Sequence, residues 1–344
     1  MVIEFRREEE FFVFQDPGGT GEMLRRKTEI RFDPLTGESS RVVFDPGLKL
    51  TPPDYTEIGD KTKGPKCPFC AENITRITPK FPSEIAPEGR IKVGESVLFP
   101  NLFPYSKHNG VAIFSGQHYV KLPEFTVEMV TNAFRGAHLY LKKVVETDPE
   151  ARYASINWNY LPYAGSSILH PHIQVIVSEQ PTNYQARTVK EGKRFYAEHQ
   201  QNYYETLLEE EAKLGQRLIK SGKHISWLHA FAPKSHLDFV GIFQGTSSLE
   251  QLNDGHWQAL AQDLVKIFRY LDSKGLASFN MLLHVPIREN PADLVHLRLV
   301  PRLTIGLLQT SDINFLQLLH QEPLSYKVPE EVVQAMNRLG IMQD

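Results

Sequence analysis

The sequence lacks a long apolar run and an excess of charge of either sign. None of its apolar runs reaches the roughly 18 residues that a membrane-spanning helix needs. Its first ten residues are too charged for a signal peptide. These absences argue against a membrane protein and a secretory leader, so we expect a soluble, cytoplasmic chain.

The charges nearly balance, with 38 basic and 41 acidic residues and a net charge of −3. No global basic field favours nucleic acid, so a phosphate-bearing substrate would need local hydrogen-bond donors. The sequence also has no GxxxxGK(S/T) loop and no kinase-type glycine loop. We therefore expect neither nucleic-acid binding nor one of these two phosphate-binding loops.

The length and composition are those of a globular chain with about two domains. Its 344 residues, 41% hydrophobic and 23% charged, suffice for two cores of ordinary size. We predict one domain over residues 1–188 and a second over residues 189–344.

Only two cysteines are present, Cys67 and Cys70, in the run Cys-Pro-Phe-Cys. Cysteines two residues apart are typical of metal ligands or of a redox pair, and they can also serve neither purpose. A redox pair usually lies between a strand and a helix, whereas residues 61–95 are rich in Pro, Gly and Lys and predict an extended loop. Metal binding is therefore favoured. Because such a pair is half of a tetrahedral zinc site, two histidines are expected to complete it.

A second cluster lies in segment 166–177, which reads SSILHPHIQVIV. His170, His172 and Gln174 are spaced by two, so in a strand they would share one face. The apolar run 175–177 predicts that the strand is buried further on. The segment therefore predicts a strand that enters the core and presents two imidazoles and an amide at its start.

Two stretches of the chain repeat each other. Residues 104–116 align without a gap on residues 233–245, and each copy continues with a helix, a strand with a central asparagine and a histidine-bearing strand. Apolar stripes over residues 127–145 and 257–271 predict the helices. The pattern predicts an α+β protein of tandem duplicated units, with antiparallel sheets and crossing helices. Between the copies, a long polar helix is expected over residues 189–220.

The two copies differ where chemistry is expected. The second copy has His296, Arg298 and Val300 where the first has His170, His172 and Gln174. It also has Ser247 in place of His118 and no cysteine pair, which indicates one active unit and one degenerate unit. His284 and His296 could hold another metal, but Arg298 stands where a third ligand would be needed, so structural histidines are the favoured interpretation.

The predicted metal ligands are Cys67, Cys70, His118 and His170. A lone loop histidine such as His118 is usually a surface residue, but the cysteine pair and the missing counterpart in the second copy favour a ligand. Two thiolates and two imidazoles suit a closed, structural zinc site. We therefore expect one zinc ion per chain.

His172 is the candidate nucleophile. A neutral imidazole can attack phosphorus and leave again, so it can carry a phosphoryl or nucleotidyl group between two substrates. The competing interpretation is a hydrogen-bonded core histidine. Gln174, Ser166 and Ser167, the two serines following Gly165, can donate hydrogen bonds to phosphate oxygens.

The sequence resembles the galactose-1-phosphate uridylyltransferase family of the histidine triad superfamily, from about Arg31 to Pro301. The resemblance lies in the runs IRFDPLTG (30–37), CPFCAEN (67–73) and NLFP (101–104). It lies most specifically in Asn159, GSS (165–167) and HPHIQ (170–174), which have the family's internal spacing. Gln174 stands where triad hydrolases carry a third histidine, which points to transfer rather than hydrolysis.

The resemblance implies a ping-pong reaction. His172 would take a nucleoside monophosphate, most simply UMP, from a nucleotide sugar, release a sugar 1-phosphate and pass the nucleotide to another hexose 1-phosphate. The resemblance also implies structural zinc and a homodimer whose partner subunit helps to bind the sugar. The residues expected to act are His172, Gln174, Ser167 and Asn159 in catalysis, and Asn101, Phe103, Ser166 and Gly165 in substrate binding.

Three features depart from the family's pattern. Arg41 and Lys49 are weak substitutes for two arginines after the N-terminal signature, Arg298 breaks the second metal site, and residues 306–308 replace a sugar-contacting Gly-Tyr-Glu. The base and the hexose therefore stay open. One alternative is a phosphorylase that cleaves an ADP-sugar or a dinucleoside polyphosphate with inorganic phosphate. A second alternative is a nucleotide-binding protein without turnover.

Overall fold

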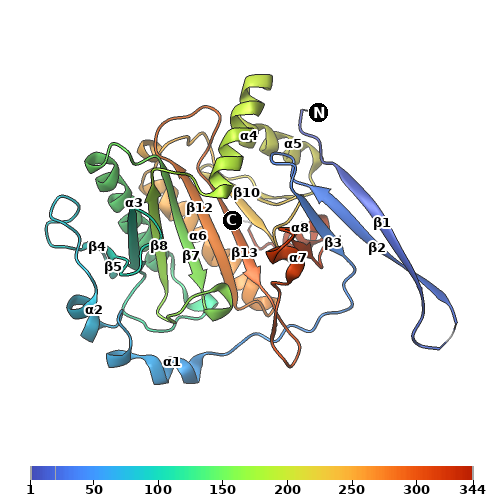
Figure 1. Ribbon diagram of the computed structural model, residues 1–344, viewed down its shortest axis with the longest axis horizontal. Helices are drawn as coiled ribbons and strands as arrows, with labels where there is room; N and C mark the ends of the chain where they lie inside the picture. Colours follow the sequence, from blue (N-terminus) through green and yellow to red (C-terminus); the bar gives the residue numbers. More distant parts are fainter. Residues whose placement is uncertain (1, 20, 343–344) are drawn as a thin grey trace.

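A ten-stranded antiparallel sheet forms the centre of the molecule in the computed structural model, which describes residues 2–19 and 21–342 (Figure 1). Its strands lie in the order β4-β5-β6-β8-β7-β12-β13-β11-β10-β9. Their bounds, in chain order, are β4 (Ile91–Val93), β5 (Ser96–Pro100), β6 (His108–Ile113), β7 (Tyr153–Tyr160), β8 (His172–Ser178), β9 (Leu218–Lys220), β10 (Ile225–His229), β11 (Phe239–Phe243), β12 (Ser278–Pro286) and β13 (His296–Arg302).

The strand order is the same on both sides of the central β7–β12 pair. Outward from this pair, β7-β8-β6-β5-β4 on one side matches β12-β13-β11-β10-β9 on the other. The two central strands pair from Tyr160 opposite Phe279 to Tyr153 opposite Pro286. The predicted α+β class is confirmed, with one continuous sheet running through both halves. The domain boundary after residue 188 stays a prediction.

Helices α3 (Val127–Thr147) and α6 (Asp254–Ser273) pack on one face of the sheet, as their apolar stripes predict (Figure 1). Thr126 and Asn253 cap them, because each side chain accepts a hydrogen bond from a backbone N–H of the first turn. Between helices and sheet lies an apolar cluster that includes the fully buried Trp158. Its indole contacts rings from both halves: Phe114, Phe125, Tyr160, Phe268 and Phe279.

The opposite face is covered over its second half by α5 (Tyr203–Leu214), which follows α4 (Asn183–His199). The prediction of one polar helix over residues 189–220 is therefore wrong. Helix α4 ends at Gln200, which has a left-handed φ of 55°. Asn202 then caps the N-terminus of α5. A helix end of this kind usually has glycine, so a glutamine there hides the break from sequence analysis.

The segment around the cysteines also differs from the extended loop predicted over residues 61–95. It contains the end of α1 (Thr56–Thr62), the 3-10 turn η1 (Gly64–Lys66) and α2 (Ala71–Ile77). Helix α2 begins directly after Cys70, its N-cap residue. Helices of seven residues make about two turns, too few for an apolar period to show in the sequence.

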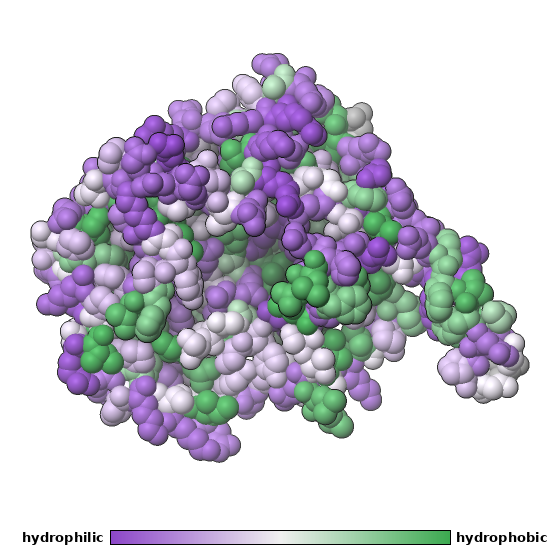
Figure 2. Space-filling model, viewed as in Figure 1, coloured by the Kyte–Doolittle hydropathy of each residue, from purple (hydrophilic) through white to green (hydrophobic). Residues whose placement is uncertain are grey.

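The N-terminal residues form a smaller sheet, in the order β1 (Arg7–Gln15), β2 (Met23–Phe32), β3 (Ser39–Val43) and β16 (Leu324–Ser325). Strands β1 and β2 make a hairpin arm that projects from the body on the right of Figure 1, and Figure 2 shows apolar surface toward its end. At the base of the arm the buried Arg31 pairs with Glu29 and with Glu330 of α8 (Pro329–Arg338). These ion pairs join the two ends of the chain.

Among the described helices, none is both long enough and apolar enough to span a membrane.

The remaining elements are short. The short elements are η2 (Leu122–Glu124), η3 (Pro162–Ala164), η4 (Leu249–Gln251), β14 (Thr304–Ile305), β15 (Thr310–Ser311) and α7 (Phe315–Leu318).

Replacing Trp158 by alanine tests whether the aromatic cluster joins the two halves. The change leaves a cavity among rings from both halves, so we expect it to lower the free energy of unfolding by about 3–5 kcal/mol. Chemical denaturation followed by circular dichroism measures this value. Phe12→Ala, at a ring that is 70% exposed, is the control and should change it by less than about 0.5 kcal/mol. An equally small effect of Trp158→Ala would contradict this packing.

Candidate active site and metal centre

Strand β8 carries the two central polar side chains of the site. It begins at His172, and the side chains of His172 and Gln174 share one partly exposed face, while Ile173, Val175 and Val177 on the other face are buried against the helices. The predicted strand is confirmed with one correction. His170 lies before the strand, and its imidazole packs against the cysteine pair instead of sharing the face of His172. Pro171 also lies outside the strand, where its missing N–H disrupts no ladder hydrogen bond.

The backbone fixes the orientation of the His172 ring. Nδ1 lies 2.8 Å from the carbonyl oxygen of His170. Because a carbonyl can only accept, Nδ1 carries the proton and Nε2 carries the lone pair. Phe69 packs against the ring in an edge-on arrangement, with ring centroids 5.2 Å apart. Burial lowers the pKa of His172, so the imidazole is neutral near pH 7 and Nε2 has a nucleophile's lone pair.

Amide side chains surround Gln174. Asn157 on β7 lies directly opposite it in register, and Asn101 Nδ2 lies 3.5 Å from Gln174 Oε1. Asn109 holds Asn101 in place, because its Oδ1 accepts a 3.0 Å hydrogen bond from Asn101 Nδ2. The structure thus brings the predicted Asn101 and Gln174 together. It adds Asn109, which sequence analysis missed because a single asparagine in a strand forms no motif.

An exposed loop follows Asn101 at the edge of this amide group. The side-chain oxygen of Asn101 accepts a hydrogen bond from the backbone N–H of Phe103. Phe103 is 75% exposed, so its ring is open to solvent. The predicted role of Phe103 in substrate binding stays a prediction.

The predicted phosphate contacts come from the end of β7 and the turn after it. Extending the β7–β8 register by two residues beyond Asn157 and Gln174 brings Asn159 alongside His172. Gly165 has a left-handed φ of 89°, and a Cβ there would lie 3.9 Å from Asn159 Nδ2. Glycine therefore permits this backbone turn and leaves space beside the amide. Figure 2 shows that this face is hollowed over the middle of the sheet.

The two serines of the turn have different surroundings. Ser166 is buried, and its hydroxyl donates a 2.8 Å hydrogen bond to the carbonyl oxygen of Ile168. Ser167 is exposed. Ser166 therefore stabilises the turn, and Ser167 is the better placed of the two to meet a ligand. The functional roles of both serines stay predictions.

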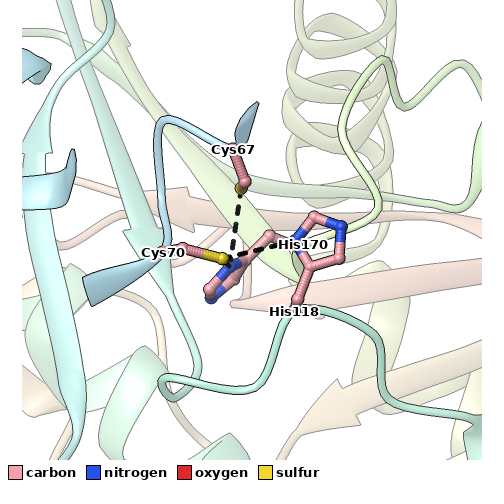
Figure 3. Close-up of side chains that lie close together, drawn as sticks. All are labelled: Cys67, Cys70, His118 and His170. Carbon is pink, nitrogen blue, oxygen red and sulfur yellow. Dashed lines mark hydrogen bonds between the residues drawn. The ribbon is translucent and has the colours of Figure 1, made fainter. Parts of the chain in front are cut away.

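The four predicted metal ligands converge, as Figure 3 shows. One donor atom from each of Cys67, Cys70, His118 and His170 lies within 4.8 Å of the others. Cys70 Sγ is 3.5 Å from His118 Nδ1 and 3.8 Å from His170 Nδ1, and Cys67 Sγ is also 3.8 Å from His170 Nδ1. A tetrahedral ion with S at about 2.3 Å and N at about 2.1 Å needs S···N separations of about 3.6 Å. The group could therefore hold a metal ion.

Outer hydrogen bonds hold both histidines of this group. His170 Nε2 donates to the carbonyl oxygen of Ser115 at 2.8 Å, and His118 Nε2 lies 3.0 Å from the hydroxyl of Thr62. The carbonyl fixes the tautomer of His170, so its Nδ1 lone pair faces the sulfur atoms. Burial raises the pKa of Cys67 to about 11 and lowers that of His170 to about 4. A bound cation is the kind of group that would stabilise the thiolate forms here.

A second group with metal-binding capacity lies on the other half of the sheet. His284 on β12 lies opposite His296 on β13, and Asp293 joins them, with donor atoms within 4.8 Å of one another. Asp293 Oδ2 is 2.8 Å from His284 Nε2. Arg298 pairs with Asp238, its Nε lying 3.2 Å from Asp238 Oδ1. Sequence analysis missed Asp293 because an aspartate three residues before a strand histidine is no recognised spacing.

The positions that depart from the family's pattern lie elsewhere in the fold. Arg41 on β3 forms ion pairs with Glu10 and Glu322. Leu307 and Leu308 lie between β14 and β15 and are 100% and 91% exposed.

One known protein can be aligned with this chain over nearly the whole length of both. No model of a known protein family matches it. A protein of Archaeoglobus fulgidus, described as uncharacterized, is 35% identical over 343 residues, which are 98% of this chain and 99% of the relative. Identity of this extent over both whole chains shows a common family.

Solved structures show the same fold at lower identity. A GalT-like protein from Arabidopsis thaliana has a TM-score of 0.67 at 18% identity, covering 89% of this chain and 97% of its own. An ADP-glucose phosphorylase from the same plant, with bound ADP-glucose, has a TM-score of 0.67 at 18% identity, covering 90% and 98%. A uridylyltransferase has a TM-score of 0.65 at 18% identity, covering 90% and 97%. The chain therefore belongs to one family with the Archaeoglobus fulgidus protein and shares its fold with the GalT-like protein, the ADP-glucose phosphorylase and the uridylyltransferase.

Proposed function

We propose that the protein is a nucleotidyltransferase that carries a nucleoside monophosphate on His172. The observation that supports this most directly is the 2.8 Å hydrogen bond from His172 Nδ1 to the His170 carbonyl, which leaves the Nε2 lone pair available. The uridylyltransferase and phosphorylase that share the fold are enzymes, which supports turnover. The proposed substrates are a nucleotide sugar and a hexose 1-phosphate, with UMP as the group transferred.

The proposed reaction has two half-reactions. Nε2 of His172 attacks the α-phosphorus, a P–N bond forms, and the P–O bond to the leaving sugar 1-phosphate breaks. In the second half-reaction a phosphate oxygen of the acceptor attacks the same phosphorus, and the P–N bond returns its electron pair to Nε2. The His170 carbonyl opposes the positive charge that the ring gains while it carries the nucleotide.

We assign the phosphate contacts to Gln174, Ser167 and Asn159. Negative charge builds up on the non-bridging oxygens in both transition states, and fixed donors aimed at that charge lower the barrier. The half-exposed position of Gln174 beside His172 on β8 supports this role. For the nucleoside we propose Asn101 and Phe103, with Gly165 and Ser166 shaping the turn. An exposed aromatic ring such as Phe103 is suited to stacking on a base.

We propose that Cys67, Cys70, His118 and His170 bind one zinc ion with a structural role. Two thiolates and two imidazoles are a common zinc set, and four protein ligands leave no position for substrate. The ion would fix the ring of His170. Since the carbonyl of the same residue orients His172, we expect the metal to affect catalysis through position alone.

The leading proposal and its alternative differ in the acceptor that takes the nucleotide from His172. The alternative is a phosphorylase, in which inorganic phosphate takes the nucleotide from an ADP-sugar or a dinucleoside polyphosphate. The fold shared with an ADP-glucose phosphorylase supports it. A nucleotide-binding protein without turnover is the third candidate.

Two further proposals concern the architecture. The matching strand orders of the two halves support a duplicated histidine-triad-like unit, divided near residue 188. We also propose a homodimer, with the partner subunit contributing to sugar binding.

A labelled nucleotide sugar tests the nucleophile. With UDP-glucose or ADP-glucose labelled at the α-phosphate, the protein should form an acid-labile, alkali-stable adduct, as a phosphoramidate on histidine does. His172→Gly should form none, because no Nε2 remains to make the P–N bond. His199→Gly, at an exposed histidine of α4, is the control and should match the unmodified protein. An adduct that survives in His172→Gly would exclude this nucleophile, and no adduct from any nucleotide sugar would favour binding without turnover.

A comparison of acceptors tests the reaction class. Once the adduct has formed, galactose 1-phosphate should release the label as a nucleotide sugar, because a sugar phosphate oxygen attacks the phosphorus. Chromatography of the products measures this release. Release by inorganic phosphate as a nucleoside diphosphate, with no release by galactose 1-phosphate, would replace the transferase proposal by the phosphorylase.

Elemental analysis tests the metal. Protein purified without chelator should contain about one zinc ion per chain. Cys67→Ser should lose most of this zinc, because the substitution removes one of the four ligands. The variant should also melt at a lower temperature, since metal binding contributes to folding. Ser115→Ala keeps the backbone carbonyl that holds His170 and should keep its zinc. A different metal in the unmodified protein would overturn the zinc assignment, and no metal at all would overturn the site.

A further inference from the structure

An asparagine of the second half lies against the proposed active site. Asn280 on β12 pairs directly with Asn159 on β7 across the seam between the two halves of the sheet. Asn280 Nδ2 donates a 2.8 Å hydrogen bond to Asn159 Oδ1 and a 2.7 Å hydrogen bond to the backbone carbonyl of Ala164. This one amide therefore donates both to the end of β7, which carries Asn159, and to the turn after it, which leads to Ser167.

The hydrogen-bond partners of Asn280 determine which atom of its side-chain amide is the nitrogen and which is the oxygen. The Ala164 carbonyl can only accept, so the atom that faces it must be the NH₂ group. Arg302 Nη1, which can only donate, lies 3.3 Å from the other end, Oδ1. Two independent contacts thus fix the amide of Asn280 in one orientation.

The orientation of the Asn280 amide also determines that of the Asn159 amide. The atom of Asn159 that meets the NH₂ group of Asn280 must be an acceptor, so it is Oδ1. The NH₂ group of Asn159 then points the other way, and it lies 3.9 Å from the place where a Cβ on Gly165 would be. The donor end of Asn159 is therefore presented on the side of the Gly165 turn, where a phosphate is proposed to bind.

The guanidinium group of Arg302 is held in turn by Asp312. Its Nε and Nη2 donate to Asp312 Oδ1 at 2.8 and 2.7 Å. Its side chain is 10% exposed, so water competes little for these hydrogen bonds. The contacts run in one line from Asp312 through Arg302 and Asn280 to Asn159, and each contact in that line joins a donor to an acceptor.

We infer that Asn280 is a positioning residue for phosphate binding, supplied to the catalytic half of the chain by the degenerate half. It acts through Asn159, whose NH₂ group it turns toward the phosphate of the substrate. This inference rests on the proposed function, since it assigns a residue to that reaction. The chemical class it concerns is the phosphate group of a nucleotide.

Asn280→Asp tests the inference because aspartate has acceptors where Asn280 has donors. To bond to the new carboxylate, the amide of Asn159 must turn through about 180° and present its oxygen to the phosphate. The new carboxylate can pair with the guanidinium of Arg302, but it loses the hydrogen bond that Asn280 donates to the Ala164 carbonyl, so the melting temperature of the variant is measured alongside to show that it folds. We expect the rate of adduct formation from a labelled nucleotide sugar to fall about 100-fold, the scale for loss of one fixed donor to a developing charge.

A double-mutant cycle separates positioning from general damage. Asn159→Ala should cause a loss of similar size, and adding Asn280→Asp to it should cause almost no further loss, because Asn280 is inferred to act on the phosphate through Asn159 and not through its hydrogen bond to the Ala164 carbonyl. Asn253→Asp makes the same chemical change at the exposed N-cap of α6, where aspartate caps as well as asparagine, and should leave the rate unchanged. If the two losses multiply in the double variant, Asn280 does not act through Asn159 and the inference is wrong.

A second readout does not depend on turnover. The side-chain NH₂ resonances of Asn159, assigned by their disappearance in Asn159→Ala, should shift in Asn280→Asp and stay in place in Asn253→Asp. Unchanged resonances would overturn the inference whatever the activity. No adduct in the unmodified protein together with the expected shift would instead reject the proposed function and keep the link between the two asparagines.

Discussion

The site depends on the two separate contacts that His170 makes. Its ring lies between the two cysteines and the Ser115 carbonyl, and its backbone carbonyl holds Nδ1 of His172. Because ring and carbonyl belong to one residue, the group that could bind a metal and the nucleophile cannot move independently. A disturbance among the cysteines therefore reaches the ring of His172 through the backbone carbonyl of His170 and through Phe69, which lies between the cysteines and packs against that ring.

Much of this arrangement is predictable from the sequence, for reasons that are local. Alternation of side chains identifies the strand that carries His172 and Gln174, and apolar stripes identify α3 and α6. The four metal-binding candidates also follow from the sequence, since the cysteine pair needs two further ligands and His118 has only Ser247 as its counterpart in the second copy. Which residues meet at the candidate site is therefore largely predictable from residue types and spacing.

What sequence analysis missed depends on contacts between distant residues. Asn280 is an ordinary asparagine until strand register places it opposite Asn159. Asp293 approaches His284 only through the β12–β13 turn, and Asn109 reaches Asn101 only through the β5–β6 pairing. The break at Gln200 is different in kind, because the residue adopts a left-handed conformation without the usual glycine. Register and such conformations are set by tertiary packing and leave little trace in a single sequence.

The seam between β7 and β12 has a consequence for how the protein is made. Tyr160 lies opposite Phe279, so the strands that meet there are more than a hundred residues apart in the chain. Pairing of such distant segments requires the closure of a long loop and is slow in folding. During synthesis the first half emerges with β7 as an uncovered edge, and such edges are prone to pair with other chains. The amide of Asn159 is held in its final orientation only after the strand containing Asn280 has emerged and joined the sheet.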